Sequence, residues 1–371
     1  MSNTERPDWL APEPWCELAG RATAASVRAA LCAEVRHEPE LAALLSPAAA
    51  VHLEAMAQAA QALTRRHFGR TISLYAPLYL SNYCSNGCTY CGFASDRNLL
   101  RRRLEFPQVE QELRKLADTG LEEVLLLTGE RNPKADFDYL LASVELASTY
   151  FHAVTVEAFP MAGAEYARLA AAGCTGVTLY QETYDPETYE KAHRWGPKRD
   201  YAARLAAPAV ALDAGIRSVG LGALLGLGDP LCDVIALYQH TRSLQRRFWR
   251  SGVSLSFPRL RPEPGGFEAP RPVGDVQLAQ IILGMRLLLP DAPLTLSTRE
   301  AARFRDGMAG VGISKMSVAS RTTVGGYARQ AEGESGQFAV SDSRDVESFA
   351  STLRGKSLEP VFKNWDATYR G

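Results

Sequence analysis

The 371-residue sequence predicts an α/β protein, a TIM-type (β/α)8 barrel with an N-terminal helical extension and a C-terminal helical segment. From residue 71 onward, eight short β-rich runs alternate with longer amphipathic stretches over about 250 residues, which is the size of one such barrel. The runs are almost continuously apolar, as strands are when helices cover both faces of a parallel sheet. A doubly wound open sheet is the alternative architecture.

Residues 1–70 are expected to form the helical extension. After a proline-rich start, "SVRAALCAEVRH" and "AAAVHLEAMAQAAQALTRRHFG" keep the helical period and are rich in Ala and Leu. This region contains no run that reads as a strand.

Residues 71–330 are expected to form the barrel. The eight predicted strands begin near residues 71, 122, 153, 176, 217, 253, 294 and 315. Several of the helical stretches between them end in Gly just before the next strand, which is typical of a helix C-cap. Residues 331–371 are more polar and are expected to pack on the barrel as a C-terminal extension, in which "SRDVESFASTLRGKS" reads as a helix.

Composition narrows the classes of partner. The chain has 41 basic and 42 acidic residues and a net charge of −1, so no nucleic-acid partner is expected. It has no run of about 18 apolar residues, so we expect no membrane span. The opening segment "MSNTERPDWLAPEPW" lacks the apolar core of a secretory signal. A cytoplasmic protein is expected.

The cysteine count also favours a cytoplasmic protein. Seven cysteines are few for this length and odd in number, which makes a disulfide framework improbable. Cys16, Cys32, Cys174 and Cys232 are scattered singly, and we interpret them as small buried apolar residues.

The remaining cysteines lie in one short loop. Cys84, Cys88 and Cys91 follow the first predicted strand in "LSNYCSNGCTYCGF". A structural zinc site needs four closed ligands, and a thioredoxin-like pair would leave Cys84 without a role. A [4Fe–4S] cluster with three thiolate ligands and one open iron fits the spacing better.

Polar residues follow the ends of most predicted strands, where the active sites of such barrels lie. These segments are Thr128–Glu130, Tyr180–Tyr184, the arginines of "FPRLRP", and Ser297–Glu300. Any one of them could be a helix N-cap or a solvated loop. Together they predict a site on one rim of the barrel.

The cysteine loop resembles that of the radical S-adenosylmethionine superfamily, in which an aromatic residue precedes the last Cys. The resemblance implies that Cys84, Cys88 and Cys91 bind three irons, and that S-adenosylmethionine chelates the fourth. It also implies reductive cleavage of S-adenosylmethionine to methionine and a 5′-deoxyadenosyl radical, which abstracts hydrogen from the substrate.

A narrower resemblance covers most of the chain, from about residue 60 to "FKNWD". The segments "PLYLSNYCSNGCTYCGF", "LLLTGE", "YQETYDPETY", "GLGALLGL", "SFPRLRPEPGG" and "LSTRE" together resemble the 2-iminoacetate synthase family. That family cleaves L-tyrosine between Cα and Cβ to 2-iminoacetate and p-cresol for thiamine thiazole formation. The resemblance implies a flavodoxin- or ferredoxin-type reductant and a thiazole synthase subunit as partners.

The resemblance also assigns cofactor contacts. Thr128, Gly129 and Glu130 match the superfamily's Gly-Gly-Glu segment, whose backbone meets the methionine amino group. Thr replaces the first Gly, which favours a backbone role at that position. Tyr90 is expected near the adenine. Gly222 lies in a glycine-rich run expected near the adenosine, although tight strand–helix packing explains its glycines equally well.

Substrate contacts are expected from three other strand ends. Arg299 is assigned to the tyrosine carboxylate, because a guanidinium can donate two hydrogen bonds to a carboxylate. Arg259 and Arg261 are rivals for that carboxylate or for the methionine carboxylate. Glu182 and Tyr180 are expected to contact the nucleoside or the substrate. The phenol must lose its proton at some stage, and the sequence selects no residue for that step.

Three other functions are compatible with parts of this pattern. A tryptophan-cleaving relative shares the barrel and the cluster, and only the polar end of the pocket separates indole from phenol. A hydrogenase-maturation relative needs further C-terminal cysteines, and no Cys follows Cys232. A non-catalytic zinc or iron–sulfur protein would consume no S-adenosylmethionine.

Overall fold

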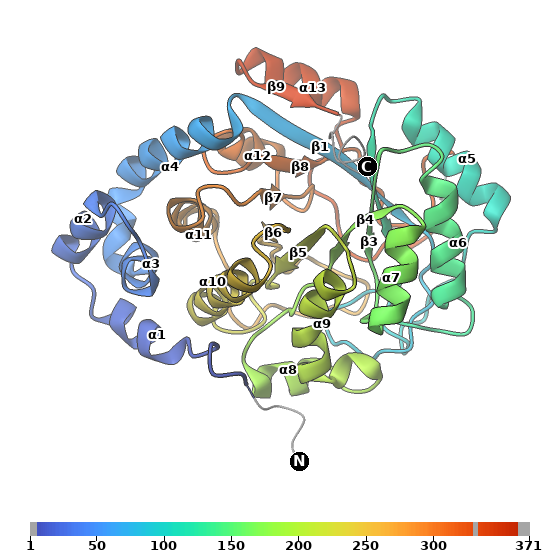
Figure 1. Ribbon diagram of the computed structural model, residues 1–371, viewed down its shortest axis with the longest axis horizontal. Coiled ribbons are helices and arrows are strands. Elements are labelled where there is room, and N and C mark those ends of the chain that lie inside the picture. The colour runs from blue at the N-terminus through green and yellow to red at the C-terminus, as the bar shows by residue number, and fades with distance from the viewer. Residues whose placement is uncertain (1–5, 329–332, 363–371) are drawn as a thin grey trace.

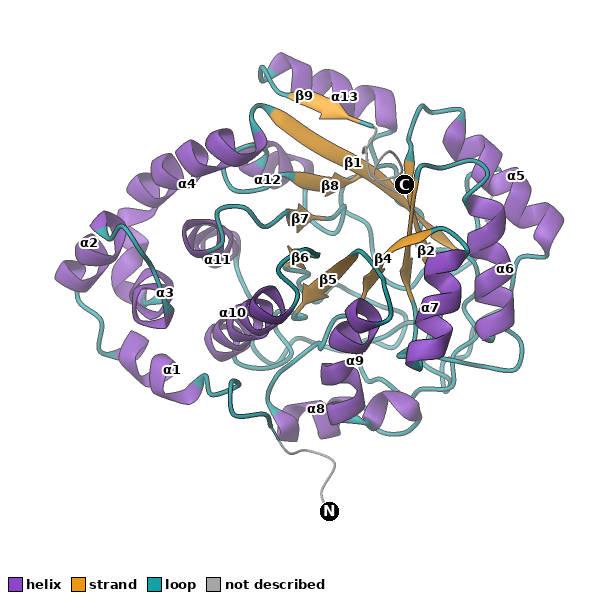
Figure 2. Cartoon of the chain, in the orientation of Figure 1, coloured by secondary structure: helices purple, strands orange, loops and turns teal. Residues whose placement is uncertain are grey.

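The computed structural model describes residues 6–328 and 333–362, and its centre is a closed ring of parallel strands surrounded by helices (Figure 1, Figure 2). The ring closes because β1 pairs with both β2 and β8. The predicted (β/α)8 barrel is therefore confirmed. Its strands are β1 (Thr71–Tyr79), β2 (Glu123–Leu127), β3 (Ala153–Glu157), β4 (Cys174–Thr178), β5 (Ser218–Gly222), β6 (Gly252–Ser256), β7 (Leu294–Leu296) and β8 (Lys315–Ser317).

The strand register places the carboxyl ends at one rim. Tyr79, the last residue of β1, pairs with Leu127, which pairs with Glu157, which in turn pairs with Thr178. The residues that follow these strands therefore emerge at the same level. The rule that barrel active sites lie at this end makes the rim the place to search for chemistry.

Amphipathic helices cover the ring and seal its outer face. Their bounds are α5 (Phe106–Ala117), α6 (Phe137–Ala147), α7 (Gly163–Ala171), α8 (Pro186–Ala192), η2 (Pro197–Arg199), α9 (Tyr201–Asp213), α10 (Pro230–Arg247), α11 (Asp275–Leu288) and α12 (Ala302–Met308). Their apolar faces join the strands in one continuous core. Helix α5 shows the pattern clearly, since Val109, Leu113 and Leu116 are buried at helical spacing.

The N-terminal region is helical and packs on the outside of the barrel. It contains α1 (Glu13–Gly20), α2 (Ala24–Cys32), α3 (Glu38–Leu45), η1 (Pro47–His52) and α4 (Leu53–Phe68). Helices α3 and α4 contact α11, and α1 contacts α10. The Gln280 amide donates to the carbonyls of Leu44 and Ser46 at 2.9 and 2.8 Å, so a buried polar contact fixes the α11 interface.

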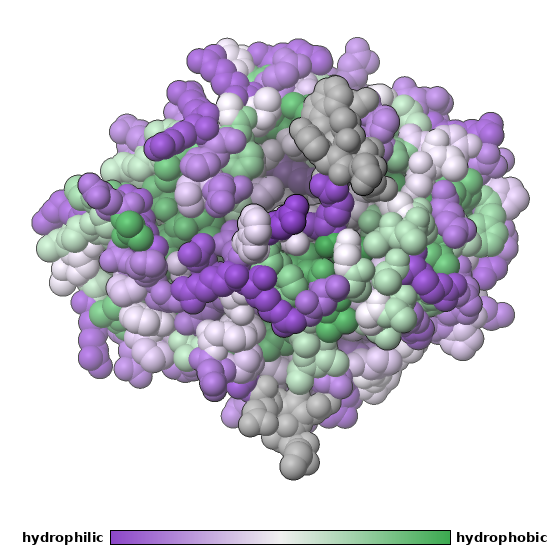
Figure 3. Space-filling view, in the orientation of Figure 1, coloured by the Kyte–Doolittle hydropathy of each residue, from purple (hydrophilic) through white to green (hydrophobic). Residues whose placement is uncertain are grey.

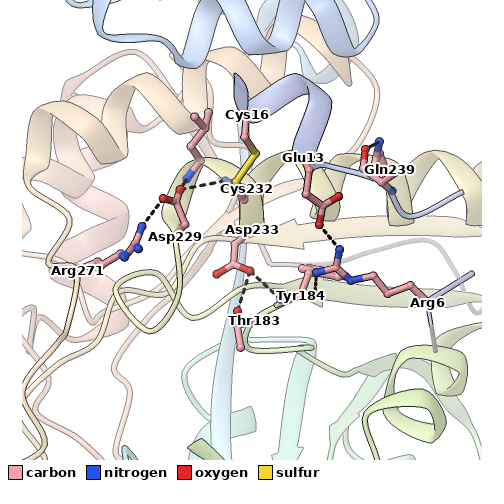
Figure 4. Close-up of a disulfide and its surroundings, with 12 residues drawn as sticks. Arg6, Glu13, Cys16, Thr183, Tyr184, Asp229, Cys232, Asp233, Gln239 and Arg271 are labelled. Carbon is pink, nitrogen blue, oxygen red and sulfur yellow. Dashed lines mark hydrogen bonds and ion pairs between the residues drawn. A yellow bond between two sulfur atoms is a disulfide. The ribbon is translucent and has the colours of Figure 1, made fainter. Parts of the chain in front are cut away.

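Two of the single cysteines are paired, which corrects the sequence interpretation. Cys16 in α1 and Cys232 in α10 form a disulfide with their Cα atoms 5.7 Å apart (Figure 4). The 216 residues between them hid the pair, because only the packing of α1 on α10 brings them together. Cys32 is exposed rather than buried, whereas Cys174 is buried as expected.

The C-terminal segment adds a helix and a strand beside the barrel. Helix α13 (Val346–Gly355) confirms the predicted helix. Strand β9 (Glu359–Val361) was not predicted, and it pairs in parallel with Thr71–Ser73 at the start of β1. A three-residue strand that contains proline carries too little pattern to be recognised in sequence. Residues 331–332 and 363–371 of the expected extension lie outside the described residues.

The surface is that of an ordinary globular protein. Hydrophilic side chains dominate the face in Figure 3, and hydrophobic ones gather near its middle. Within the described ranges, no helix is both long and apolar enough to cross a membrane.

Candidate active site

A cavity at the carboxyl ends of the strands collects most of the predicted site residues. The side chains that line it come from the cysteine loop, from the ends of β2, β3 and β4, from η2 and α9, and from the ends of β6 and β7. They include Cys84, Asn86, Cys88, Tyr90, Cys91, Thr128, Gly129, Glu130, Glu157, Tyr180, Glu182, Lys198, Arg204, Arg261, Arg299, Gln337 and Phe338. Segments more than 200 residues apart in sequence thus share one site.

The three loop cysteines all face this cavity and lie close enough to influence one another electrostatically. The backbone N–H of Glu130 lies 3.3 Å from Cys84 Sγ, and the Gln337 amide lies 3.6 Å from Cys91 Sγ. Such N–H donors to cysteine sulfur are a usual feature of iron–sulfur sites.

The donor set fits a cluster better than a single ion. Across the described ranges, no three His, Cys, Asp or Glu side chains converge tightly enough to bind one metal ion. A cubane cluster spreads its thiolates over separate irons, so three cysteines around one cavity suit it. Burial raises the pKa of the Cys84 thiol, and it raises the pKa of Cys88 to about 12 against the opposing charge of Lys198. Iron would offset this cost, because metal binding favours the thiolate.

The end of β2 lies directly against the cysteine loop. A Cβ atom at Gly129 would approach the Cys84 Cβ to 2.8 Å, so only glycine fits there. The Glu130 carboxylate accepts a hydrogen bond from the Asn86 amide at 3.1 Å, which ties this strand end to the loop. The Thr128 hydroxyl donates to the Gly129 carbonyl at 3.0 Å, so its side chain is used locally.

The end of β4 carries a buried carboxylate in a strained backbone conformation. Glu182 has a φ of 72°, which is rare for a residue other than glycine. Its carboxylate lies 2.6 Å from the Lys198 ammonium and 3.8 Å from the Arg204 guanidinium. Neither cation was foreseen, because η2 and α9 are not strand ends. The lysine and arginine hold the Glu182 side chain at the wall of the cavity.

Helix α10 braces this strained loop from behind. The Asp233 carboxylate accepts hydrogen bonds from the Thr183 hydroxyl at 2.9 Å and from the Tyr184 backbone N–H at 2.7 Å (Figure 4). Burial raises the pKa of Asp233 to about 7. Cys232 directly precedes Asp233 in the chain, so the disulfide fixes α1 to the same turn that supports the loop.

The two tyrosines expected in the site both line the cavity. The Tyr90 hydroxyl is 2.8 Å from the His193 Nε2, and the Lys198 ammonium lies 5.7 Å from the centre of its ring. Burial raises the pKa of both Tyr90 and Tyr180 well above the ordinary value. Both phenols therefore stay protonated and serve as walls and hydrogen-bond donors.

The three predicted arginines differ in what they contact. The Arg259 guanidinium forms two hydrogen bonds with the buried Glu300 and does not line the cavity, which makes it a weaker candidate than Arg299 for a bound carboxylate. The Arg261 guanidinium lines the cavity but also donates to Glu300 at 3.0 Å. The Arg299 guanidinium lies 3.3 Å from the centre of the Phe338 ring, and in the described part of the chain it has no acidic partner.

Gly222, which was expected near the adenosine, does not line the cavity. A Cβ atom there would lie 2.6 Å from the Tyr180 ring. The packing explanation of this glycine therefore holds in the structure. The neighbouring Leu224 reaches the cavity instead.

Glu157, the last residue of β3, lines the cavity and was not foreseen. The signal was present in the sequence, since "AVTVEAFP" ends an apolar run with a glutamate. Burial and the nearby Glu182 carboxylate together raise the pKa of Glu157 to about 7, against the opposing charges of Arg299, Lys198 and Arg204.

A second, larger cavity of about 580 Å³ shares no lining residue with the first. Its walls include Arg6, Glu13, Tyr184, Cys232 and Arg271. Several of its charged groups pair with one another, as Arg6 does with Glu13 and Arg271 does with Asp229. Cavity size alone would therefore select the wrong site.

Comparisons with known proteins agree with this geometry. Residues 78–240 match the model of the radical SAM superfamily, and residues 256–359 match that of the biotin and thiamin synthesis associated domain. The chain is 42% identical over 346 residues to the 2-iminoacetate synthase of Escherichia coli (strain K12), which covers 93% of this chain and 92% of that protein. The 2-iminoacetate synthase of Salmonella typhimurium gives the same identity and coverage.

The fold also matches solved structures over almost the whole chain. The crystal structure of HydG, a maturase of the [FeFe]-hydrogenase, has a TM-score of 0.92 and 29% sequence identity, and the match covers 98% of this chain and 82% of that chain. HydG from Carboxydothermus hydrogenoformans gives a TM-score of 0.85 at 30% identity, covering 96% of this chain and 82% of that chain.

Proposed function

The chain belongs to the 2-iminoacetate synthase family of the radical S-adenosylmethionine superfamily, and from this we propose that it cleaves the Cα–Cβ bond of L-tyrosine to 2-iminoacetate and p-cresol. The observation that carries the proposal is one cavity in which three loop cysteines face an arginine without an acidic partner among the described residues. The enzyme is a radical SAM lyase that uses a [4Fe–4S] cluster and S-adenosylmethionine.

The residues around the cavity have distinct tasks in this proposal. Cys84, Cys88 and Cys91 hold the cluster. When bound, the cluster and S-adenosylmethionine supply the electron and the 5′-deoxyadenosyl radical that abstracts hydrogen from the substrate. Glu182, held by Lys198 and Arg204, presents a fixed carboxylate to the hydroxyl or amino groups of the ligand.

Arg299 binds the tyrosine carboxylate. Its guanidinium carbon lies 3.3 Å from the centre of the Phe338 ring, a contact that restricts the side chain and leaves it without an acidic partner among the described residues. Arg259 and the buried Glu300 form a rigid support beside it. Holding the substrate at one end places Cα at a constant distance from the radical source, which matters because the adenosyl radical is indiscriminate.

The proposal also includes the protein that donates the electron and the protein that receives the product. A flavodoxin- or ferredoxin-type protein supplies the electron in the cytoplasm, and a thiazole synthase subunit receives the 2-iminoacetate for thiamine formation. The names of the relatives and the match to the biotin and thiamin synthesis associated domain support the thiamine part of this setting.

Anaerobic reconstitution with iron and sulfide, followed by reduction with S-adenosylmethionine and tyrosine, tests the function. We expect p-cresol and 5′-deoxyadenosine from the reconstituted protein. Cys88→Ser should abolish both products because one iron loses its ligand, whereas Cys32→Ser should keep them because Cys32 is exposed and remote from the cavity. If 5′-deoxyadenosine appears only with tryptophan, the tyrosine lyase proposal is wrong.

A further inference from the structure

Three carboxyl groups line the cavity, and only one of them lacks a polar partner. Glu130 accepts from the Asn86 amide, and Glu182 pairs with Lys198. The Glu157 side chain has no hydrogen bond or ion pair with any described residue, although it opens onto the cavity. Among these carboxyls it is therefore the group free to exchange a proton with a ligand.

The other titratable groups that face Glu157 are protonated tyrosines, cations, and one carboxylate that is already paired with cations. Tyr75 and Tyr79 on β1 and Tyr180 after β4 have pKa values raised by burial, so they stay protonated. The cations that act on it are Arg299 after β7, Lys198 on η2 and Arg204 on α9. Glu182 is the remaining neighbour, and its carboxylate is already paired with Lys198 and Arg204.

Glu157 and Arg299 lie on opposite sides of the barrel, so a substrate that contacts both must span the cavity between them. Glu157 ends β3, and Arg299 follows β7, which lies opposite β3 in the closed ring of eight strands. Yet both side chains line the same cavity, and Arg299 still lowers the pKa of Glu157. A ligand that joins these groups would offer an anionic group to Arg299 and a proton donor to Glu157.

We propose that Glu157 is a catalytic residue that accepts the phenolic proton of the bound tyrosine. The inference rests on the function proposed above. In this step the phenol O–H bond breaks, its electron pair stays on the oxygen, and the proton forms a new bond to a Glu157 carboxylate oxygen. The proton returns to the cresol oxygen before product leaves, so Glu157 is unchanged over a turnover. No electron passes through it.

The pH dependence follows from the environment of Glu157. Because its pKa is raised to about 7, the carboxylate form that accepts a proton increases as pH rises through that value. The rate of p-cresol formation by the reconstituted enzyme should therefore rise with pH across an acidic limb near 7. Glu157→Gln removes the titrating group, so the limb should flatten and the rate should fall about 100-fold or more, the usual range for loss of a general base.

Two further measurements distinguish a role of Glu157 as proton acceptor from a purely structural role. Gln can still accept a hydrogen bond from the phenol, so tyrosine binding to the unreduced, S-adenosylmethionine-loaded protein should change less than about threefold in Glu157→Gln. Fluorinated tyrosines, whose phenols are more acidic and already ionised at the assay pH, should recover most of the lost rate in this variant. They should have little advantage in the wild type.

Glu187→Gln is the matched control, since Glu187 lies on the exposed face of α8 and should behave as the wild type. Cluster absorbance and the unfolding midpoint check that Glu157→Gln folds, and Glu157→Ala, which also lacks the titrating group, replaces it if it does not. The proposal is overturned if Glu157→Gln keeps the acidic limb, or if acidic tyrosines give no recovery. Absence of p-cresol from the wild type would instead reject the tyrosine lyase function itself.

Discussion

At the scale of single residues, the partner of each arginine decides what it can do. Arg259 donates to Glu300, to the Val273 carbonyl at 2.9 Å and to Asp275 at 2.8 Å, so its donors are occupied. Arg299 stacks on Phe338 and faces the cavity. An arginine satisfied by protein groups is a structural element, whereas one held only by stacking is prepared for an anionic ligand.

Arg299→Ala should therefore impair catalysis without loss of the fold. We expect the catalytic efficiency for tyrosine to fall about 100-fold, because a desolvated charge-assisted contact contributes roughly 1.5–3 kcal/mol. Arg299→Lys should recover only part of this, since an ammonium cannot fork two hydrogen bonds. Steady-state kinetics would measure the loss, and cluster absorbance and S-adenosylmethionine binding should stay unchanged. Unaltered kinetics in both variants would remove Arg299 from substrate binding.

At the scale of elements, the cysteine loop depends on its contact with the segment that follows α8. The Gly87 N–H donates to the Trp195 carbonyl at 3.0 Å, and the Trp195 indole N–H donates to the Ser95 hydroxyl at 2.8 Å. The indole ring covers Gly87 so closely that an added Cβ would lie 2.6 Å from its Cζ2 atom. The ring thus shields the residue just before Cys88 from solvent.

Gly87→Ala should push the indole aside and loosen the loop. We expect a destabilisation of about 1–3 kcal/mol, as for other overpacked contacts, together with faster loss of the cluster in air. Denaturant unfolding and the decay of cluster absorbance would measure the two effects. Gly307→Ala is a suitable control, because no atom lies within 4 Å of an added Cβ in α12. Equal cluster lifetimes in the two variants would contradict the proposed shielding.

The sequence predicted features that have a local residue pattern, and it missed contacts that form only when two elements pack together. The eight strands and the cysteine loop each have a local pattern, and the rim rule leads from them to Arg299 and Glu182. Lys198, Arg204 and the Cys16–Cys232 pair depend on how helices pack behind the strands, which no local pattern records. The contact of Arg259 with Glu300, 41 residues away, was missed for the same reason.

At the scale of the whole molecule, the two ends of the barrel have different tasks. The carboxyl ends of the strands carry the cavity, and the opposite end holds the ring closed. There the fully buried Arg286 on α11 donates to the carbonyls of Gly312 and Ala292 at 3.0 and 2.8 Å. It also reaches the carbonyls of Leu289 and Pro290. One guanidinium therefore joins α11 to the segments that lead into β7 and β8.

Arg286→Met should separate stability from catalysis. Removing the guanidinium leaves several buried carbonyls without a donor, and each such loss costs roughly 1–3 kcal/mol, so the free energy of unfolding should fall by about 3 kcal/mol or more. Arg66→Met on the exposed face of α4 is the control and should change stability by less than about 0.5 kcal/mol. Below the unfolding transition, Arg286→Met should retain the tyrosine-cleavage rate within about twofold, because its contacts lie at the far end of the strands from Arg299. Denaturant unfolding and p-cresol formation on the same preparations would test this. A large rate loss in folded Arg286→Met would show that the closure of the ring also sets the geometry of the rim.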